Sequence, residues 1–144
     1  MIHMVKLCVG ISSVEELESY RYERAHWWGA DYGEDVHVHR TRMTPKRGDE
    51  MEGKASIYWV IAGSIGCRQK ILRFGSHTSE EGINYCDLIL DPEIVRTVPY
   101  PKRPFQGWRY LRPEDAPPDL GVGANDDSDN SMEIAAELAR MGLI

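Results

Sequence analysis

Residues 56–65 read SIYWVIAGSI and form the most apolar stretch of the chain. The consecutive letters YWVI have no polar break, which is typical of a strand that is buried on both faces. Gly63 and Gly66 indicate a bulge or a tight bend. The letters CRQKILRFG that follow continue as a strand to about residue 74. This stretch therefore predicts the centre of a sheet.

Other strands are expected on both sides of this centre. MIHMVKLCVG predicts a strand over 2–9, VHVHRTRM alternates strictly over 36–43, and INYCDLILD predicts a strand over 83–91. The four prolines of 92–111 exclude a central strand over most of that segment. FQGWRYL at its end can form a short closing strand.

Helical signals lie mainly toward the ends of the chain. Ser12 and Ser13 each precede a glutamate by three residues, which is a double chance of a capping box, and the period that follows predicts a helix over 13–28, ended by Gly29. A single helical turn fits 48–52. MEIAAELARMGL, near the C-terminus, predicts a short amphipathic helix.

The order of these elements predicts the fold class. Strands joined by short turns cannot supply the crossovers of a parallel sheet. We expect an α+β domain over 1–121, with a mostly antiparallel, strongly bent sheet or a small barrel. Residues 122–144 are expected to form an acidic flexible segment and the short terminal helix.

Composition indicates a cytoplasmic protein. The chain has 144 residues, enough for one domain with its own core. No apolar run approaches the length of a membrane helix, and MIHMVKLCVG is too short and too polar for a signal peptide. Cys8, Cys67 and Cys86 form no CxxC pair and are expected to be buried free thiols.

Charge is distributed unevenly along the chain. Residues 1–35, 36–112 and 113–144 carry net charges of −4, +5 and −7. A basic middle can mark an anionic partner, or the acidic ends can fold over it and neutralise it. The sequence pI of about 5.3 counts against strong nonspecific nucleic-acid binding.

Four motifs resemble a known family: HRTRMTPKR, SIYWVIAGSIGCRQKIL, CDLILDPEIV and RPFQGWRYLRPEDAPPDLG. The chain is similar over most of its length to the mainly alphaproteobacterial family called domain of unknown function 1489. That resemblance implies a bacterial cytoplasmic setting and carries over no catalytic residue. The layout of elements, though no motif, also resembles the PUA-like barrels, which include the ASCH and EVE domains that bind RNA or modified bases.

The stretch PKRPFQGWRYL, residues 101–111, interleaves cations with aromatic rings. Guanidinium groups such as those of Arg103 and Arg109 bind phosphate oxygens in a fork, and rings such as Phe105 and Trp108 can stack on bases. Strand alternation places Trp108 and Tyr110 on one face and Arg109 on the other. The alternative is that the rings belong to the core and the cations are solvated.

A second cluster of cations lies in HRTRMTPKR, where the basic side chains are Arg40, Arg42, Lys46 and Arg47. If strands 36–43 and 66–74 lie close together, Arg68 joins them in one patch that attracts phosphate. The alternative is a solvated strand face whose cations pair with carboxylates.

His37 and His39 share one face of a strand, but nothing nearby in the sequence supplies a third metal ligand. No P-loop and no GxGxxG fingerprint precedes a helix, so no nucleotide cofactor is indicated. His39 is the candidate acid or base if the protein is an enzyme.

Three functions follow from these patterns. The leading one is binding of RNA or a nucleotide through a basic-aromatic cleft, with Trp59 as a further stacking candidate. The second is a small enzyme that acts on a phosphorylated or nucleotide substrate through His39. The third is a protein-interaction module with aromatic anchors. The sequence leaves the ligand and the oligomeric state open.

Overall fold

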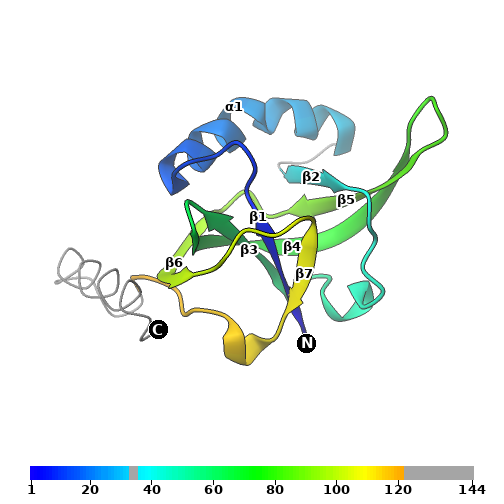
Figure 1. Cartoon of the computed structure of the whole chain (residues 1–144). Coiled ribbons are helices and arrows are strands. Elements are labelled where there is room, and N and C mark those ends of the chain that lie inside the picture. Colours follow the sequence, from blue (N-terminus) through cyan, green and yellow to red (C-terminus); the bar gives the residue numbers. More distant parts are fainter. Residues whose placement is uncertain (33–35, 122–144) are drawn as a thin grey trace.

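The computed structural model of the chain describes residues 1–32 and 36–121 (Figure 1). The acidic segment and the terminal helix expected over 122–144 lie outside these residues. The described strands are β1 (His3–Leu7), β2 (His37–Thr41), β3 (Ser56–Ile61), β4 (Ser64–Thr78), β5 (Asn84–Leu90), β6 (Val95–Pro101) and β7 (Trp108–Leu111).

These strands form one mixed sheet of seven strands in the described residues, in the order β2-β5-β4-β3-β1-β7, with β6 paired to β4. β1 and β3 run parallel, and every other pair is antiparallel. The expected α+β class with a mostly antiparallel, bent sheet is confirmed. The barrel alternative is not, because the order ends at β2 and β7 without closing.

The central stretch contains a hairpin rather than the strand expected over 56–65. β3 ends at Ile61, and β4 begins at Ser64. Both residues of the turn have positive φ angles, 51° at Ala62 and 84° at Gly63, as a two-residue turn of type I′ requires. The tight bend expected at Gly63 is therefore confirmed.

A β-bulge at Gly66 moves β4 from one face of the sheet to the other. Trp59 pairs with Cys67, whereas Val60 pairs with Ile65, so Gly66 is an extra residue on β4. Cys67 consequently joins the core beneath the helix, and Ile65 joins the core on the opposite face. A Cβ on Gly66 would lie 3.3 Å from Val14 Cγ2, so the missing side chain also lets the helix start close to the sheet.

β6 was not expected as a strand, because its segment is rich in proline. It pairs with β4 and has one further isolated bridge, from Thr97 to Asp119. Pro99 and Pro101 are therefore accommodated in a strand beside β4 that is not central, which agrees with the rule that proline avoids central strands.

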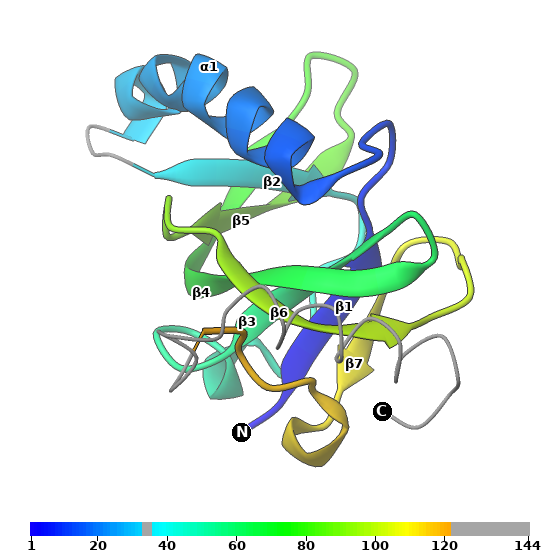
Figure 2. The same cartoon turned by 90° about the vertical axis from the view of Figure 1, so that its left-hand side faces the viewer.

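Helix α1 (Val14–Tyr32) lies across one side of the sheet, next to β2, in both views (Figures 1 and 2). Its start has the expected capping contacts: Ser13 Oγ accepts from the Glu16 amide at 3.1 Å, and the Ser12 amide donates to Glu16 Oε2 at 3.2 Å. The helix continues through Gly29, where it was expected to end. A glycine within a helix costs only about 1 kcal/mol relative to alanine, and the helix tolerates it here. The turn expected at 48–52 is a 3₁₀ turn at Gly48–Glu50.

Apolar side chains pack on both faces of the sheet. On the face toward α1, here called the helix face, Leu17 packs with Met4, Trp59 and their neighbours. On the opposite face, here called the far face, Val5, Tyr58, Val60, Ile65 and Leu111 form a second core. The three cysteines are buried free thiols, as expected. None of the described helices is long and apolar enough to cross a membrane.

Candidate functional site

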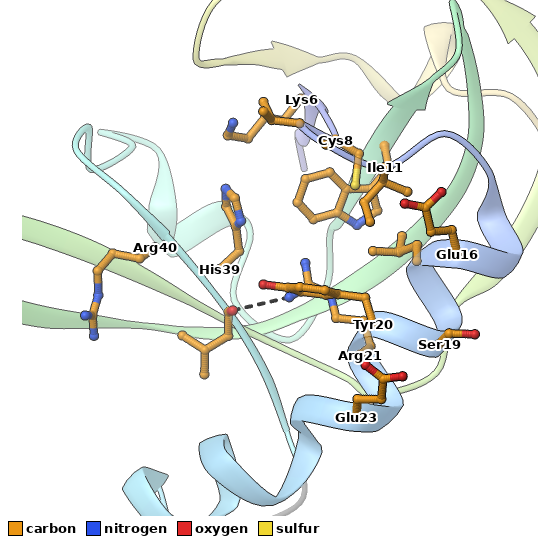
Figure 3. A pocket seen from close by; sticks show the side chains of 15 residues that line it. Lys6, Cys8, Ile11, Glu16, Ser19, Tyr20, Arg21, Glu23, His39 and Arg40 are labelled. Carbon is orange, nitrogen blue, oxygen red and sulfur yellow. Dashed lines mark hydrogen bonds between the residues drawn. The ribbon is translucent and has the colours of Figure 1, made fainter.

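A cavity of about 710 Å³ lies between α1 and the strands β1, β2 and β3 (Figure 3). Its lining combines basic side chains (Lys6, Arg21, His39 and Arg40), two rings (Tyr20 and Trp59) and two carboxylates (Glu16 and Glu23). Lys6 enters from β1, Arg21 from α1 and His39 from β2, so basic groups far apart in the sequence meet in one space.

Arg21 is the most buried cation of the cavity. It lies one helical turn after Leu17 on the inward side of α1, and only 5% of it is exposed. Nη1 donates to the Val38 carbonyl at 3.3 Å, and Nε has no partner. The guanidinium carbon lies 5.6 Å from the ring centres of both Tyr20 and Trp59. Among the side chains that the structure describes, no carboxylate contacts Arg21.

Other arginines of the protein show what this guanidinium lacks. Arg40, Arg47 and Arg68 each use Nε and Nη2 as a two-pronged fork on one carboxylate, with distances of 2.6–2.9 Å. In Arg21 the same edge has an unbonded Nε. Burying a cation without a counter-charge costs several kcal/mol, so an anion with two acceptor oxygens would offset a penalty that the described residues leave uncompensated.

His39 supplies a second unpartnered nitrogen. Its Nε2 is buried and has no hydrogen-bond partner in the described part of the chain, and its ring makes an edge contact with Trp59 at 5.1 Å between ring centres. Burial, followed by the charges of Lys6 and Arg21, lowers the pKa of His39 to about 3, with Asp87 acting weakly in the opposite direction. His39 is therefore neutral at pH 7 and can donate or accept one hydrogen bond at Nε2.

Lys6 and Cys8 come from successive inward positions at the end of β1. Burial is the main cause that lowers the pKa of Lys6, which shows that its ammonium is partly removed from water. Burial also raises the pKa of the Cys8 thiol to about 11. Cys8 is therefore a neutral thiol at pH 7 and has none of the thiolate character that a cysteine nucleophile requires.

The structure brings part of the two predicted basic segments together on the helix face. Trp108 pairs with Lys6 in the register of β7 and β1, so the two side chains share that face. Trp108 Nε1 donates to the Met43 carbonyl at 2.9 Å, and the Arg47 amide donates to the Tyr110 hydroxyl at 3.1 Å. The rings of β7 therefore hold the segment that follows β2.

Arg103, Phe105 and Arg109 lie elsewhere. Arg109 pairs with Val5, whose side chain belongs to the core of the far face, and its guanidinium carbon lies 4.6 Å from the centre of the Phe105 ring. The expected separation of Arg109 from Trp108 and Tyr110 is confirmed.

The single patch that was expected from strands 36–43 and 66–74 does not form, because β5 lies between β2 and β4. Arg40 binds Asp87 and points away from the other basic groups of the cavity (Figure 3). Arg68 binds Asp119 at 2.7 Å. Arg42 lies over the ring of Tyr85 at 5.5 Å, and Lys46 is exposed.

Other predicted residues have structural partners. Trp59 is buried and donates to Gln69 at 3.0 Å, so only part of its ring is available as a cavity wall. His37 contacts the same Gln69 side chain at 3.1 Å instead of joining His39. The described residues contain no group of three His, Cys, Asp or Glu side chains that could hold a metal ion.

Sequence reasoning missed Arg21 and Lys6 as site residues. Arg21 falls four positions after Leu17, on the side of α1 that the helical period predicts to face the sheet. A charged residue at an inward position of an amphipathic helix was the available signal. Lys6 likewise interrupts the inward row of β1, between Met4 and Cys8.

The fold and the cavity define an α+β protein with a cationic cavity between its single described helix and a mixed sheet. The model of a family described as "Protein of unknown function (DUF1489)" matches residues 4–144, so the chain belongs to this family. No curated protein and no solved structure matches the chain.

Proposed function

We propose that the protein binds a phosphate-bearing ligand of nucleotide size in the cavity beneath α1. The observation that carries this proposal is Arg21, a buried guanidinium whose Nε is unbonded and which no described carboxylate neutralises. A phosphate oxygen pair on this edge would complete the fork that Arg40, Arg47 and Arg68 form with carboxylates.

Three donors around one space favour phosphate over carboxylate. Arg21, Lys6 and His39 approach from three different elements, and a phosphate has enough oxygens to meet all of them, whereas a carboxylate has two. The two cations raise the local positive potential in a cavity that is shielded from bulk water, where each interaction with an anion is stronger than at the surface.

The rest of the cavity favours a nucleotide over inorganic phosphate. Its volume of about 710 Å³ exceeds what one phosphate needs and falls in the range of small-molecule sites. Ile11, Leu17 and the Trp59 ring provide an apolar wall for a base, and the Glu23 carboxylate can accept from a ribose hydroxyl or an amino group. Nucleotides and buried free thiols both belong to the reducing cytoplasm, and the proposal places the protein there.

Isothermal titration calorimetry tests this proposal. We expect ribonucleoside monophosphates to bind wild-type protein, and the matching nucleosides to bind at least about 10-fold more weakly because they lack the charge-assisted bonds. Arg21→Met should lower nucleotide affinity by about 10- to 100-fold. Arg47→Met removes an exposed, paired arginine and is the matched control. Equal binding by Arg21→Met and wild type, or no binding of any nucleotide, would contradict the proposal.

A second candidate is an enzyme that acts on a phosphorylated substrate, with His39 as acid or base. The unpartnered Nε2 in the cavity is the observation that favours it. An anion bound beside His39 would raise its pKa from about 3 toward the range useful for proton transfer. Under this candidate His39→Asn abolishes phosphate release from a nucleotide substrate but changes nucleotide affinity little. Unchanged turnover in His39→Asn would rule out the role of His39.

A further inference from the structure

We infer that a second anion-binding site lies on the far face of the sheet and takes the sugar-phosphate backbone of a single-stranded nucleic acid. The site is a groove of about 370 Å³ between the end of β6 and the start of β7. The lining residues used below are Tyr100, Lys102, Arg103, Phe105 and Arg109. They differ in place, exposure and shape from those of the cavity, so this inference does not depend on nucleotide binding there.

The charge of the groove is not neutralised by its surroundings. None of its lining residues is acidic, and no described carboxylate pairs with Lys102, Arg103 or Arg109. In contrast, the partly or fully exposed arginines 40, 47, 68, 96 and 112 each bind a carboxylate. An acidic protein of net charge −6 therefore leaves three cations unpaired in one groove.

The register of β7 separates this groove from the cavity. Trp108 and Tyr110 pair with Lys6 and Met4 on the helix face, whereas Arg109 pairs with Val5 on the far face. Phe105 packs against the core of the far face. A ligand in the groove and a ligand in the cavity would consequently lie on opposite faces of the sheet.

The backbone around the groove is held in place. Pro101 and Pro104 have fixed φ angles, and the Lys102 amide donates to the Gly63 carbonyl of the β3–β4 turn at 2.9 Å. Gly107 turns the chain back into β7 with a φ of 69°, which favours glycine. A constrained segment loses less conformational entropy when it binds a ligand than a flexible one does.

The chemistry of the groove matches a single strand. Arg109 lies flat over Phe105, which leaves its N–H edge available for phosphate oxygens, and Arg103 and Lys102 add positive charge on the same segment. The Tyr100 ring is 39% exposed and offers a surface on which a base can stack. A groove this small accepts one strand rather than a duplex.

Fluorescence anisotropy with a short labelled oligouridylate RNA tests the inference, with the DNA oligomer of the same length as a second probe. We expect salt-sensitive binding to wild-type protein. The Arg103→Gln/Arg109→Gln variant should bind about 10-fold more weakly or worse, and its salt slope should fall by about 2, one for each lost phosphate contact. Tyr100→Ser should weaken binding about 10-fold through lost stacking.

The matched control removes two charges on the other side of the molecule. Arg42→Gln/Lys46→Gln alters the same net charge, and we expect it to bind RNA within about 3-fold of wild type. Arg21→Met should also bind RNA like wild type, so failure of the cavity proposal and failure of this one can be distinguished. Equal losses in both double variants, salt-insensitive binding, or no binding to either probe at low salt would overturn the inference.

Discussion

Arg21 differs from the other arginines at the scale of single residues, because burial and lack of a partner occur together. An ion pair satisfies Arg40 and Arg68, so their role in the fold is clear. Arg21 instead has one long bond to a carbonyl and an unbonded Nε in a cavity. A side chain that is kept at a cost to folding is best explained by binding.

This explanation predicts an unusual effect of Arg21→Met on stability. Methionine can fill similar space without the desolvation penalty of a buried charge. We expect the free energy of unfolding of Arg21→Met to lie within about 1 kcal/mol of the wild-type value, or above it. The control is Arg68→Met, which leaves Asp119 unpaired and should lose about 1–2 kcal/mol. Urea denaturation measures both, and a loss in Arg21→Met greater than in Arg68→Met would show that Arg21 mainly supports the fold.

His39 makes stability depend on pH. Its pKa falls from 6.5 to about 3 in the folded protein, so between these values the unfolded chain binds more protons. The contribution of neutral His39 is present above about pH 6.5 and is lost as the pH falls toward 3. The groups that face it are Lys6 from β1, Arg21 from α1 and Asp87 from β5.

We therefore compare wild type with His39→Asn by urea denaturation at pH 7 and pH 5. Between these values wild type should lose about 2 kcal/mol more than the variant, since each pH unit below 6.5 is worth up to about 1.4 kcal/mol. The same pH dependence in both proteins would mean that His39 is accessible to protons in the folded state.

At the scale of elements, the β3–β4 hairpin fixes the centre of the sheet. Ala62 has a φ of 51°, a conformation that alanine rarely adopts and asparagine tolerates. Ala62→Asn creates the Asn-Gly pair favoured in type I′ turns and should raise the free energy of unfolding by about 0.5–1 kcal/mol. Urea denaturation measures the change. Ala62→Val, with a branched side chain at the same position, should be destabilising, and a stable valine variant would refute this account of the turn.

The strands were largely predictable from sequence, because their apolar runs and alternation depend on local pattern. β6 was not expected, since a proline-rich segment can form a strand only beside a suitable neighbour, and β4 supplies it over 64–68. The end of α1 was also misplaced. Glycine only weakly disfavours a helix, and the residues after Gly29 decided the outcome.

The site was less predictable than the fold. Alternation correctly separated Arg109 from Trp108 and Tyr110, because strand periodicity is local. The joining of Lys6, Arg21 and His39 depends on how α1, β1 and β2 pack, which no local pattern contains. The predicted Arg40 reaches the same cavity, but Asp87 holds its side chain on the other side of β2.

At the scale of the whole molecule, the cavity separates α1 from the sheet. Of the α1 side chains that the structure describes, only Leu17 and Arg21 are buried. Two ion pairs from Arg96, to Glu15 and Glu18, tie the start of the helix to β6, and both are exposed enough to be weak. A ligand that bridges Arg21, Lys6 and His39 would add a stronger link.

We therefore expect a nucleotide to slow amide hydrogen exchange in α1. The effect should be largest around residues 17–24, where the helix meets the cavity, and absent in Arg21→Met. Amides of β4 and β5 serve as the internal control, because neither strand lines the cavity. Slower exchange across all elements by the same factor would indicate general stabilisation instead of a contact with the helix.

The most direct test of the central claim is the ¹H–¹⁵N spectrum of the arginine Nε–H groups during titration with a nucleotide. The Arg21 signal is assigned by its absence in Arg21→Met. We expect this signal to shift as Nε gains an oxygen acceptor, while the signals of Arg40 and Arg68, which are already bonded to Asp87 and Asp119, stay in place. An Arg21 signal that does not move at saturating nucleotide would contradict the claim that this buried guanidinium binds phosphate.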